Sequence, residues 1–294
     1  MTARIWIALL VVYVVWGSTY LAIRIAIETL PLFFMAGVRF LVAGAVLYAW
    51  AVRRGDRARD APGAAQWRAA ALVGAGLFLG GNGGVVFAES RIPSGATALL
   101  VATLSLWMAL LAWIALGERP PRRVLAGLPL GFAGMAILVG PVDASGLDPL
   151  GAAACLFASL SWAAASLYSR HAPLPARTAL STAMQMICGG VWMLAASAAT
   201  GELAHLRPET FSTASLAAMA YLIVAGSLLA FSAYAWLLRN APTPLVATYA
   251  YVNPVVAVLL GWAFAGEPVT ARTIAAGTTI LAAVALIASG GRRG

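Results

Sequence analysis

Residues 259–267 read LLGWAFAGE and residues 110–118 read LLAWIALGE, so one short text is written twice in the chain. The two copies lie 149 positions apart, and at the same offset Arg123 corresponds to Arg272. Each copy is a long apolar segment, a Gly-Glu turn with a nearby arginine, and a second apolar segment. An internal repeat of this length predicts two similar halves. We expect the function to lie where the halves meet.

The composition predicts a membrane protein. Of 294 residues, 62% are hydrophobic and only 10% are charged, and the mean hydropathy is +0.89. A soluble domain must keep a wetted exterior, which this composition does not supply. A helix crosses the hydrocarbon core with about 20 apolar residues, because the core is about 30 Å thick and each residue adds about 1.5 Å. Ten such helices would use about 200 residues and leave short loops.

Ten apolar segments are visible along the chain, and they predict an all-α integral membrane protein. Helices are required because backbone groups in lipid must be satisfied internally, and the alternation of a β-barrel is missing. Residues 141–148 are the one plausible linker, which places the halves at residues 1–141 and 142–294. The expected spans are residues 5–27, 32–52, 67–88, 93–116, 124–139, 149–168, 176–199, 213–238, a span after Pro242 and Pro244 that ends at 265, and 272–288.

The arginines set the expected orientation. The sequence contains no lysine, and its net charge of +9 comes from arginines between apolar spans, which favours a cytoplasmic face over nucleic-acid binding. With the N-terminus inside, fourteen arginines are cytoplasmic and four are external, so both termini are expected in the cytoplasm of a multi-pass inner membrane protein. Five spans per half is an odd number. The second half therefore enters the membrane inverted, an arrangement typical of secondary transporters.

Several motifs resemble one transporter family. They are Trp16-Gly17-Ser18, Arg39, the Gly117-Glu118 and Gly266-Glu267 turns, and Asn253-Pro254. On these motifs essentially the whole chain resembles the EamA-type members of the drug/metabolite transporter superfamily. The resemblance implies helices around a central cavity and export of amino acids and other metabolites, and it is weaker for the subgroup that exports aromatic amino acids. Family members often carry a mid-span proline; Pro254 matches it, whereas Ser105 stands at the equivalent position of the first half.

Aromatic, amide and hydroxyl side chains in mid-span are the candidate substrate-binding residues. Trp16 and Tyr20 share one face of the first span with Tyr13, at helical steps of three and four. Such side chains suit a pocket for neutral organic solutes, although aromatic residues also pack at membrane interfaces. The candidates are Trp16, Tyr20, Asn82, Trp107, Trp162, Ser166, Tyr249, Tyr251 and Asn253.

A glycine-rich stretch in the third span has two interpretations. Residues 80–84 read GGNGG, and the glycines weaken a helix while Asn82 is costly in lipid without a partner. The stretch either loosens a helix that lines a polar cavity or packs closely against a neighbouring helix. Gly81, Gly83 and Pro254 are the candidate hinge residues.

Charged side chains in or near the spans are few. Arg39 lies about eight residues into the second span and could hold a substrate carboxylate, but we favour snorkelling or pairing with Glu28. Glu118 and Glu267 are expected at the interfaces as caps or ion-pair partners. The acidic residues lie at or beyond span ends and both histidines in loops, so no titratable side chain is expected at depth, and transport is expected to be facilitative.

These features predict a secondary exporter of small neutral or zwitterionic metabolites, amino acids first, that works by alternating access. A carrier for amphipathic drugs or cations is the alternative within the class; a membrane-embedded sensor or enzyme is the alternative outside it. No catalytic residue, metal site or cofactor motif is found, and Cys155 and Cys188 are expected to be packing residues. The expected partners are a small-molecule substrate and the lipid bilayer, with no nucleic acid. The oligomeric state stays open, a monomer being plausible.

Overall fold

The computed structural model describes residues 3–54, 61–117, 121–139, 147–241 and 249–290, and all regular structure in these ranges is helical. The predicted all-α class is therefore confirmed for the described residues. Within the described ranges, seven helices are long and apolar enough to cross a membrane, and a shorter apolar helix covers Val252–Ala265. The seven are Ala3–Ala26, Leu32–Arg53, Ala64–Glu89, Ser94–Ala115, Pro149–Ser169, Thr178–Ala199 and Thr213–Tyr234.

The first half contains two irregular spans. Its third span is one rod with a π-helical middle, and its fourth span is interrupted at residues 102–103. The elements are α1 (Ala3–Ala26), α2 (Leu32–Arg53), α3 (Ala64–Gly74), η1 (Ala75–Gly83), α4 (Gly84–Glu89), α5 (Ser94–Val101), α6 (Leu104–Leu116) and α7 (Arg122–Val139).

The second half repeats this order, and its third span again has a π-helical middle. Its elements are α8 (Pro149–Ser169), α9 (Thr178–Ala199), the short 3-10 helices η2 (Glu202–His205) and η3 (Pro208–Thr210), α10 (Thr213–Tyr221), η4 (Leu222–Leu229), α11 (Ala230–Asn240), α13 (Tyr249–Ala265) and α14 (Ala271–Gly290).

The glycine of the repeated Gly-Glu pair has one backbone conformation in both halves. Gly117 ends α6 with φ of 68°, and Gly266 follows α13 with φ of 65°. A side chain is strained in this left-handed region, so glycine is the residue that can end both helices this way. The turn that identified the repeat in the sequence is thus a structural repeat as well.

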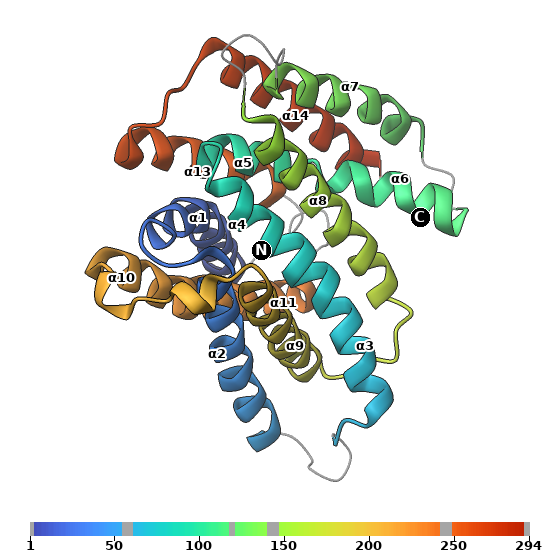
Figure 1. Cartoon of the computed structure of the whole chain (residues 1–294). Helices are drawn as coiled ribbons and strands as arrows, with labels where there is room; N and C mark the ends of the chain where they lie inside the picture. Colours follow the sequence, from blue (N-terminus) through green and yellow to red (C-terminus); the bar gives the residue numbers. More distant parts are fainter. Residues whose placement is uncertain (1–2, 55–60, 118–120, 140–146, 242–248, 291–294) are drawn as a thin grey trace.

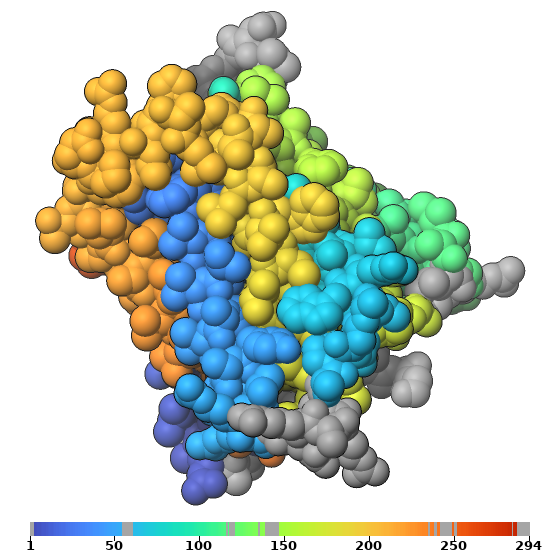
Figure 2. Space-filling model, turned by 60° about the horizontal axis from the view of Figure 1, so that its bottom comes forward, coloured from blue at the N-terminus to red at the C-terminus, as the bar shows by residue number. Residues whose placement is uncertain are grey.

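Equivalent helices of the two halves pack against each other. Helix α2 lies along α9, and α7 lies along α14 (Figure 1). Figure 2 shows α2 in blue between α9 in yellow and the α10–η4 span in orange. Most other close helix pairs also join the two halves: α1 packs on η4 and α13, and α8 packs on η1, α5 and α6. The core is therefore built between the halves rather than within each one.

Glycines bring α2 and α9 close together. A Cβ at Gly190 would lie 2.7 Å from the backbone nitrogen of Leu41 and 2.9 Å from the carbonyl oxygen of Gly37. A Cβ at Gly37 would in turn lie 2.8 Å from the side chain of Leu194. In lipid, helices associate largely through such close packing of small residues. The space between these two helices is therefore filled by backbone.

Replacing Gly190 with alanine is expected to lower the melting temperature of the protein in detergent. Alanine favours a helix over glycine by about 1 kcal/mol, but overpacking against backbone costs about 1–3 kcal/mol. The control is Gly63→Ala, where a Cβ would meet nothing within 4 Å. A thermal-shift assay compares the two. Equal melting temperatures would show that α2 and α9 separate without cost.

Candidate functional site

A cavity of about 320 Å³ lies between the halves, with walls from α1, η1, α8, α11 and α13. Most of its wall is apolar, and a few hydroxyl, amide and charged groups interrupt it. It is lined by Trp16, Thr19, Tyr20, Ile23, Arg39, Leu77, Gly81, Asn82, Val85, Val101, Leu104, Ala158, Ser159, Trp162, Ser166, Phe231, Tyr234, Tyr249 and Asn253. Ligand sites have this character: apolar surface with a small number of placed polar groups.

Four aromatic rings form one wall of the cavity, which we call the aromatic cluster. The ring of Trp16 lies 5.2 Å from Phe231, 5.1 Å from Tyr234 and 5.3 Å from Tyr249, centroid to centroid. Tyr234 and Tyr249 meet edge to face at 5.6 Å. These distances and the mostly edge-on geometry are those of favourable aromatic pairs. The cluster joins α1 of the first half to α11 and α13 of the second.

Arg39 also lines the cavity, which corrects its expected role at the surface. Its side chain is only 5% exposed, and its Nε donates to the hydroxyl of Ser227 at 3.0 Å. Its guanidinium lies 4.6 Å from the centre of the Phe40 ring. Among the described residues no carboxylate, Glu28 included, lies within ion-pairing distance of it. A buried cation without a counter-ion is costly, and such residues in membranes usually serve function.

The π-helix η4 holds Arg39 and Trp16 side by side. Trp16 Nε1 donates to the carbonyl of Gly226 at 3.2 Å, one residue before the Ser227 that binds Arg39. A Cβ at Gly226 would lie 3.3 Å from Arg39 Nη2 and 3.1 Å from Thr19. π-helical segments are rare and frequent at functional sites. Here the segment brings an indole from α1 and a guanidinium from α2 to one part of the cavity.

The other π-helix, η1, fits both interpretations of the glycine-rich stretch. Asn82 lines the cavity, and its Nδ2 donates to the carbonyl of Leu77 at 3.2 Å. Gly80 instead packs against α8, since a Cβ there would overlap Ser161. Gly81 does both: it lines the cavity, and a Cβ on it would lie 2.8 Å from the ring of Trp162.

The candidate hinges differ in their surroundings. Gly83 is buried, and a Cβ on it would lie 3.4 Å from the Phe33 ring. Pro254 is buried within α13. Neither Gly81 nor Gly83 has the positive φ that would require glycine. Hinge motion at these positions stays a prediction.

Seven of the nine candidate residues line the cavity: Trp16, Tyr20, Asn82, Trp162, Ser166, Tyr249 and Asn253. The amide nitrogen of Asn253 faces the backbone carbonyls of Tyr13 at 3.3 Å and of Tyr249 at 3.2 Å. Trp107 does not line it; the indole packs edge-on against Phe132 at 5.4 Å, between α6 and α7. The side chain of Tyr251 lies outside the described residues.

Sequence reasoning missed Thr19, Phe231 and Tyr234, which also line the cavity. Thr19 follows Trp16 at a helical step of three, a signal that was available. Phe231 and Tyr234 also lie at a helical step of three, but the sequence does not show which neighbour that face of the eighth span meets. Only its packing against α1 selects the face that meets the cavity.

Two carboxyl groups among the described residues are buried inside the protein, although Glu89 ends its helix, as expected of an acidic residue at a span end. The expectation that no titratable side chain lies deep in the membrane stays a prediction. Glu89 is 1% exposed and Glu267 is 8% exposed. Glu267 does cap a helix, as expected, but from a buried position. Its Oε1 accepts from the backbone N–H and the hydroxyl of Ser94, both at 2.8 Å, and its Oε2 accepts from the Gly95 N–H at 3.2 Å. Glu118 lies outside the described residues.

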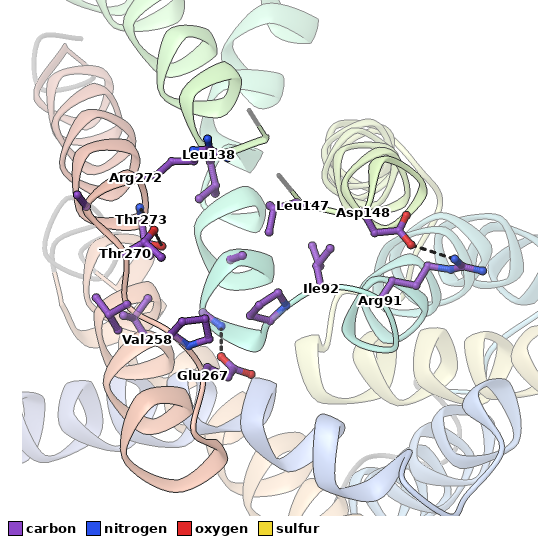
Figure 3. Close-up of a pocket in the computed structure, with 16 residues that line it drawn as sticks. Arg91, Ile92, Leu138, Leu147, Asp148, Val258, Glu267, Thr270, Arg272 and Thr273 are labelled. Carbon is purple, nitrogen blue, oxygen red and sulfur yellow. Dashed lines mark hydrogen bonds and ion pairs between the residues drawn. The ribbon is translucent and has the colours of Figure 1, made fainter. Parts of the chain in front are cut away.

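A second hollow, of about 480 Å³, lies beside the Glu267 cap (Figure 3). Two pairs of its polar groups are engaged with each other: Arg91 Nη1 lies 3.1 Å from Asp148 Oδ2, and Thr270 accepts from the Thr273 N–H; Arg272 also lines the hollow. The Gly151 backbone N–H, assisted by Arg91, holds the pKa of the Asp148 carboxyl below its usual range. These contacts cap and tie helix ends. The central cavity, with an aromatic wall and a buried cation, is therefore the better candidate site.

Apolar spans around a solute-sized cavity define a multi-pass membrane protein of the carrier type. Residues 4–140 and 149–289 each match the EamA-like transporter family, and the chain belongs to that family. The family expected from the sequence motifs is thereby confirmed. The protein is a transmembrane transporter with membrane-spanning helices, and it has a small-molecule substrate.

Named relatives agree with this class. The chain is 38% identical over 284 residues to the "Uncharacterized inner membrane transporter YedA" of Escherichia coli (strain K12), covering 96% of this chain and 90% of the relative. It is 24% identical over 286 residues to the "Probable amino-acid metabolite efflux pump" of Salmonella typhimurium (strain LT2), covering 94% and 91%. A crystal structure with 19% identity superposes with a TM-score of 0.65 over 97% of this chain and 96% of that one, which shows the fold alone.

Replacing Arg39 with methionine is expected to raise the melting temperature in detergent. The change removes a buried charge that has one hydroxyl partner, and exchanging buried ionic groups for apolar ones of similar size can stabilise by about 1 kcal/mol or more. The control is Arg170→Met at an exposed position, which should change little. A lower melting temperature for Arg39→Met alone would assign Arg39 a structural role.

Proposed function

We propose that this transporter exports amino acids across the inner membrane by alternating access, with Arg39 binding the substrate carboxylate. One observation carries the proposal: Arg39 is buried in the cavity wall, and no carboxylate among the described residues neutralises it. A guanidinium can bind a carboxylate through two parallel charge-assisted hydrogen bonds. A substrate carboxylate would supply the missing counter-charge. This role replaces the structural role expected from the sequence.

The rest of the cavity suits a zwitterion. A substrate ammonium can lie against the faces of Trp16, Tyr234 or Tyr249, which attract cations through their ring quadrupoles. The apolar wall can hold the substrate side chain, and about 320 Å³ is near the lower end of known ligand pockets. No acidic residue is among the described residues that line the cavity, which disfavours a purely cationic drug. The printed name of the Salmonella relative supports the same substrate class.

We further propose ten spans in two inverted halves, residues 1–141 and 142–294, with both termini in the cytoplasm. Helices α7 and α14 then complete the halves, and α13 is the ninth span. Three observations support this arrangement: the order of elements repeats, both third spans contain a π-helix, and equivalent helices of the two halves pack against each other. Two similar halves related by a pseudo-two-fold axis can exchange inward and outward openings around a fixed site.

Single cysteines test this orientation. In a variant without Cys155 and Cys188, we expect a membrane-impermeant maleimide to label Glu209→Cys on intact cells. His171→Cys, exposed at the opposite end, should be labelled only after lysis. The reason is the excess of arginine on the proposed cytoplasmic side. Labelling of His171→Cys on intact cells would refute the orientation.

Counterflow in proteoliposomes tests the substrate and the role of Arg39. Wild-type protein should exchange radiolabelled amino acids, and amino-acid carboxamides should compete poorly because they lack the carboxylate. Arg39→Gln should raise KM roughly tenfold or more, since a charge-assisted hydrogen bond contributes about 1.5–3 kcal/mol. Exposed Arg170→Gln is the matched control.

Three results would contradict the proposal in different ways. Equal competition by carboxamides would remove Arg39 as the carboxylate site. Transport of amphipathic cations without amino acids would favour the drug carrier. If no solute in the panel exchanges, the alternative of a sensor or enzyme gains support.

A further inference from the structure

Glu89, the last residue of α4, is a buried carboxyl group without a hydrogen-bond partner. Its side chain is 1% exposed, and among the described residues neither Oε1 nor Oε2 has a donor within reach. Glu267 is buried close to it but accepts three hydrogen bonds from Ser94 and Gly95. The two carboxyl groups therefore differ: three hydrogen bonds stabilise the ionised form of Glu267, and no hydrogen bond stabilises the ionised form of Glu89.

The one cation near Glu89 is engaged elsewhere. Arg24 of α1 donates through Nη1 to the backbone carbonyls of Glu89 at 3.2 Å and Ile92 at 3.4 Å. Its Nε lies 3.8 Å from Glu267 Oε1. Arg24 thus holds the α4–α5 turn and the capping carboxylate together (Figure 3 shows Glu267 beside this turn). It makes no bond to the Glu89 side chain.

The titratable groups that face Glu89 come from three further elements. They are Tyr20 and Arg24 on α1, Cys155 on α8 and Glu267 after α13. Arg39 on α2, which also packs on α4, binds Ser227 and faces the cavity instead. Tyr20 lines the cavity and is close enough to Glu89 for their charges to interact, so Glu89 lies on the Tyr20 side of the cavity without lining it.

We propose that Glu89 is a proton-binding site that couples export of the substrate to entry of a proton; this rests on the proposed function. A proton on either oxygen removes a charge that no hydrogen bond stabilises and that Arg24, engaged with two carbonyls and Glu267, offsets only in part. The packing seen here therefore suits the neutral carboxyl. When the proton leaves, the anion attracts Arg24 and repels Glu267. Both effects weaken the contact that joins α1, the α4–α5 turn and the residue after α13.

Because the proton on Glu89 stabilises this contact, the position of the contact sets the directions in which the proton and the substrate move. In the proposed orientation the Arg24–Glu89–Glu267 cluster is at the outer end. Glu89 takes a proton from outside as that end closes, and releases it past Tyr20 into the cavity once the cavity opens to the cytoplasm. The ionised carrier then returns with substrate to the outward-open state. One proton enters as one substrate leaves, which is antiport. This proposal takes the place of the facilitative transport expected from the sequence.

The test uses the full chain in proteoliposomes with an acidic interior, a radiolabelled amino acid outside and a pH dye inside. Wild type should accumulate the amino acid above equilibrium while protons leave. Glu89→Gln mimics the neutral carboxyl, so it should keep counterflow without a pH gradient, but its accumulation should fall to the equilibrium value. Glu209→Gln, an exposed carboxyl, is the control and should keep both activities.

The outcomes separate the two proposals. Absence of counterflow in wild type overturns the proposed function and this inference with it. Counterflow without accumulation or proton movement overturns the coupling alone. Accumulation that persists in Glu89→Gln overturns the assignment to Glu89. Should Glu89→Gln fail to fold, Glu89→Asp decides: its proton movement must show a shifted pH midpoint, and an unchanged midpoint also overturns the assignment.

Discussion

Backbone polar groups inside a bilayer need partners within the protein, because no water is present there to supply them. Carbonyls of both π-helical segments accept bonds from side chains. Ser161 of α8 donates to Gly76 in η1 at 2.9 Å, and Trp16 of α1 donates to Gly226 in η4 at 3.2 Å. Each irregular segment is therefore supported by a residue of the opposite half. The irregular backbone is tolerated only where the halves meet, which is also where the cavity lies.

This constraint ties the shape of the cavity to the contact between the halves. Trp16 is both a hydrogen-bond donor to η4 and the centre of the aromatic cluster. Arg39 likewise reaches the cavity by crossing from α2 to Ser227 in η4. A movement of one half against the other must therefore change the groups that face a substrate. A rigid pocket within one half would not have this property.

The sequence was sufficient for the helices, the repeat and seven cavity residues, because apolar length and helical spacing are local properties. Burial depends on neighbours, and there the sequence was less informative. Arg39 looked shallow when counted from the start of its span, but its side chain turns to η4 and is buried there. Trp107 carried the same mid-span signal as Trp16, yet it faces α7. The third span was expected to end at Ala88; the helix includes Glu89, and packing buries that carboxyl.

Arg39 and Glu89 carry opposite charges, and the fold keeps them apart. Arg39 is directed to η4 by Ser227, while Glu89 ends α4, which packs against α1 and α8. Had the two side chains met, they would form a buried ion pair that needs nothing from outside the chain. Held separately, each requires a mobile partner: an anion in the cavity for the guanidinium and a proton for the carboxyl. A carrier built this way is least stable when it is empty and ionised, so the states that exchange between openings are those that carry substrate or proton.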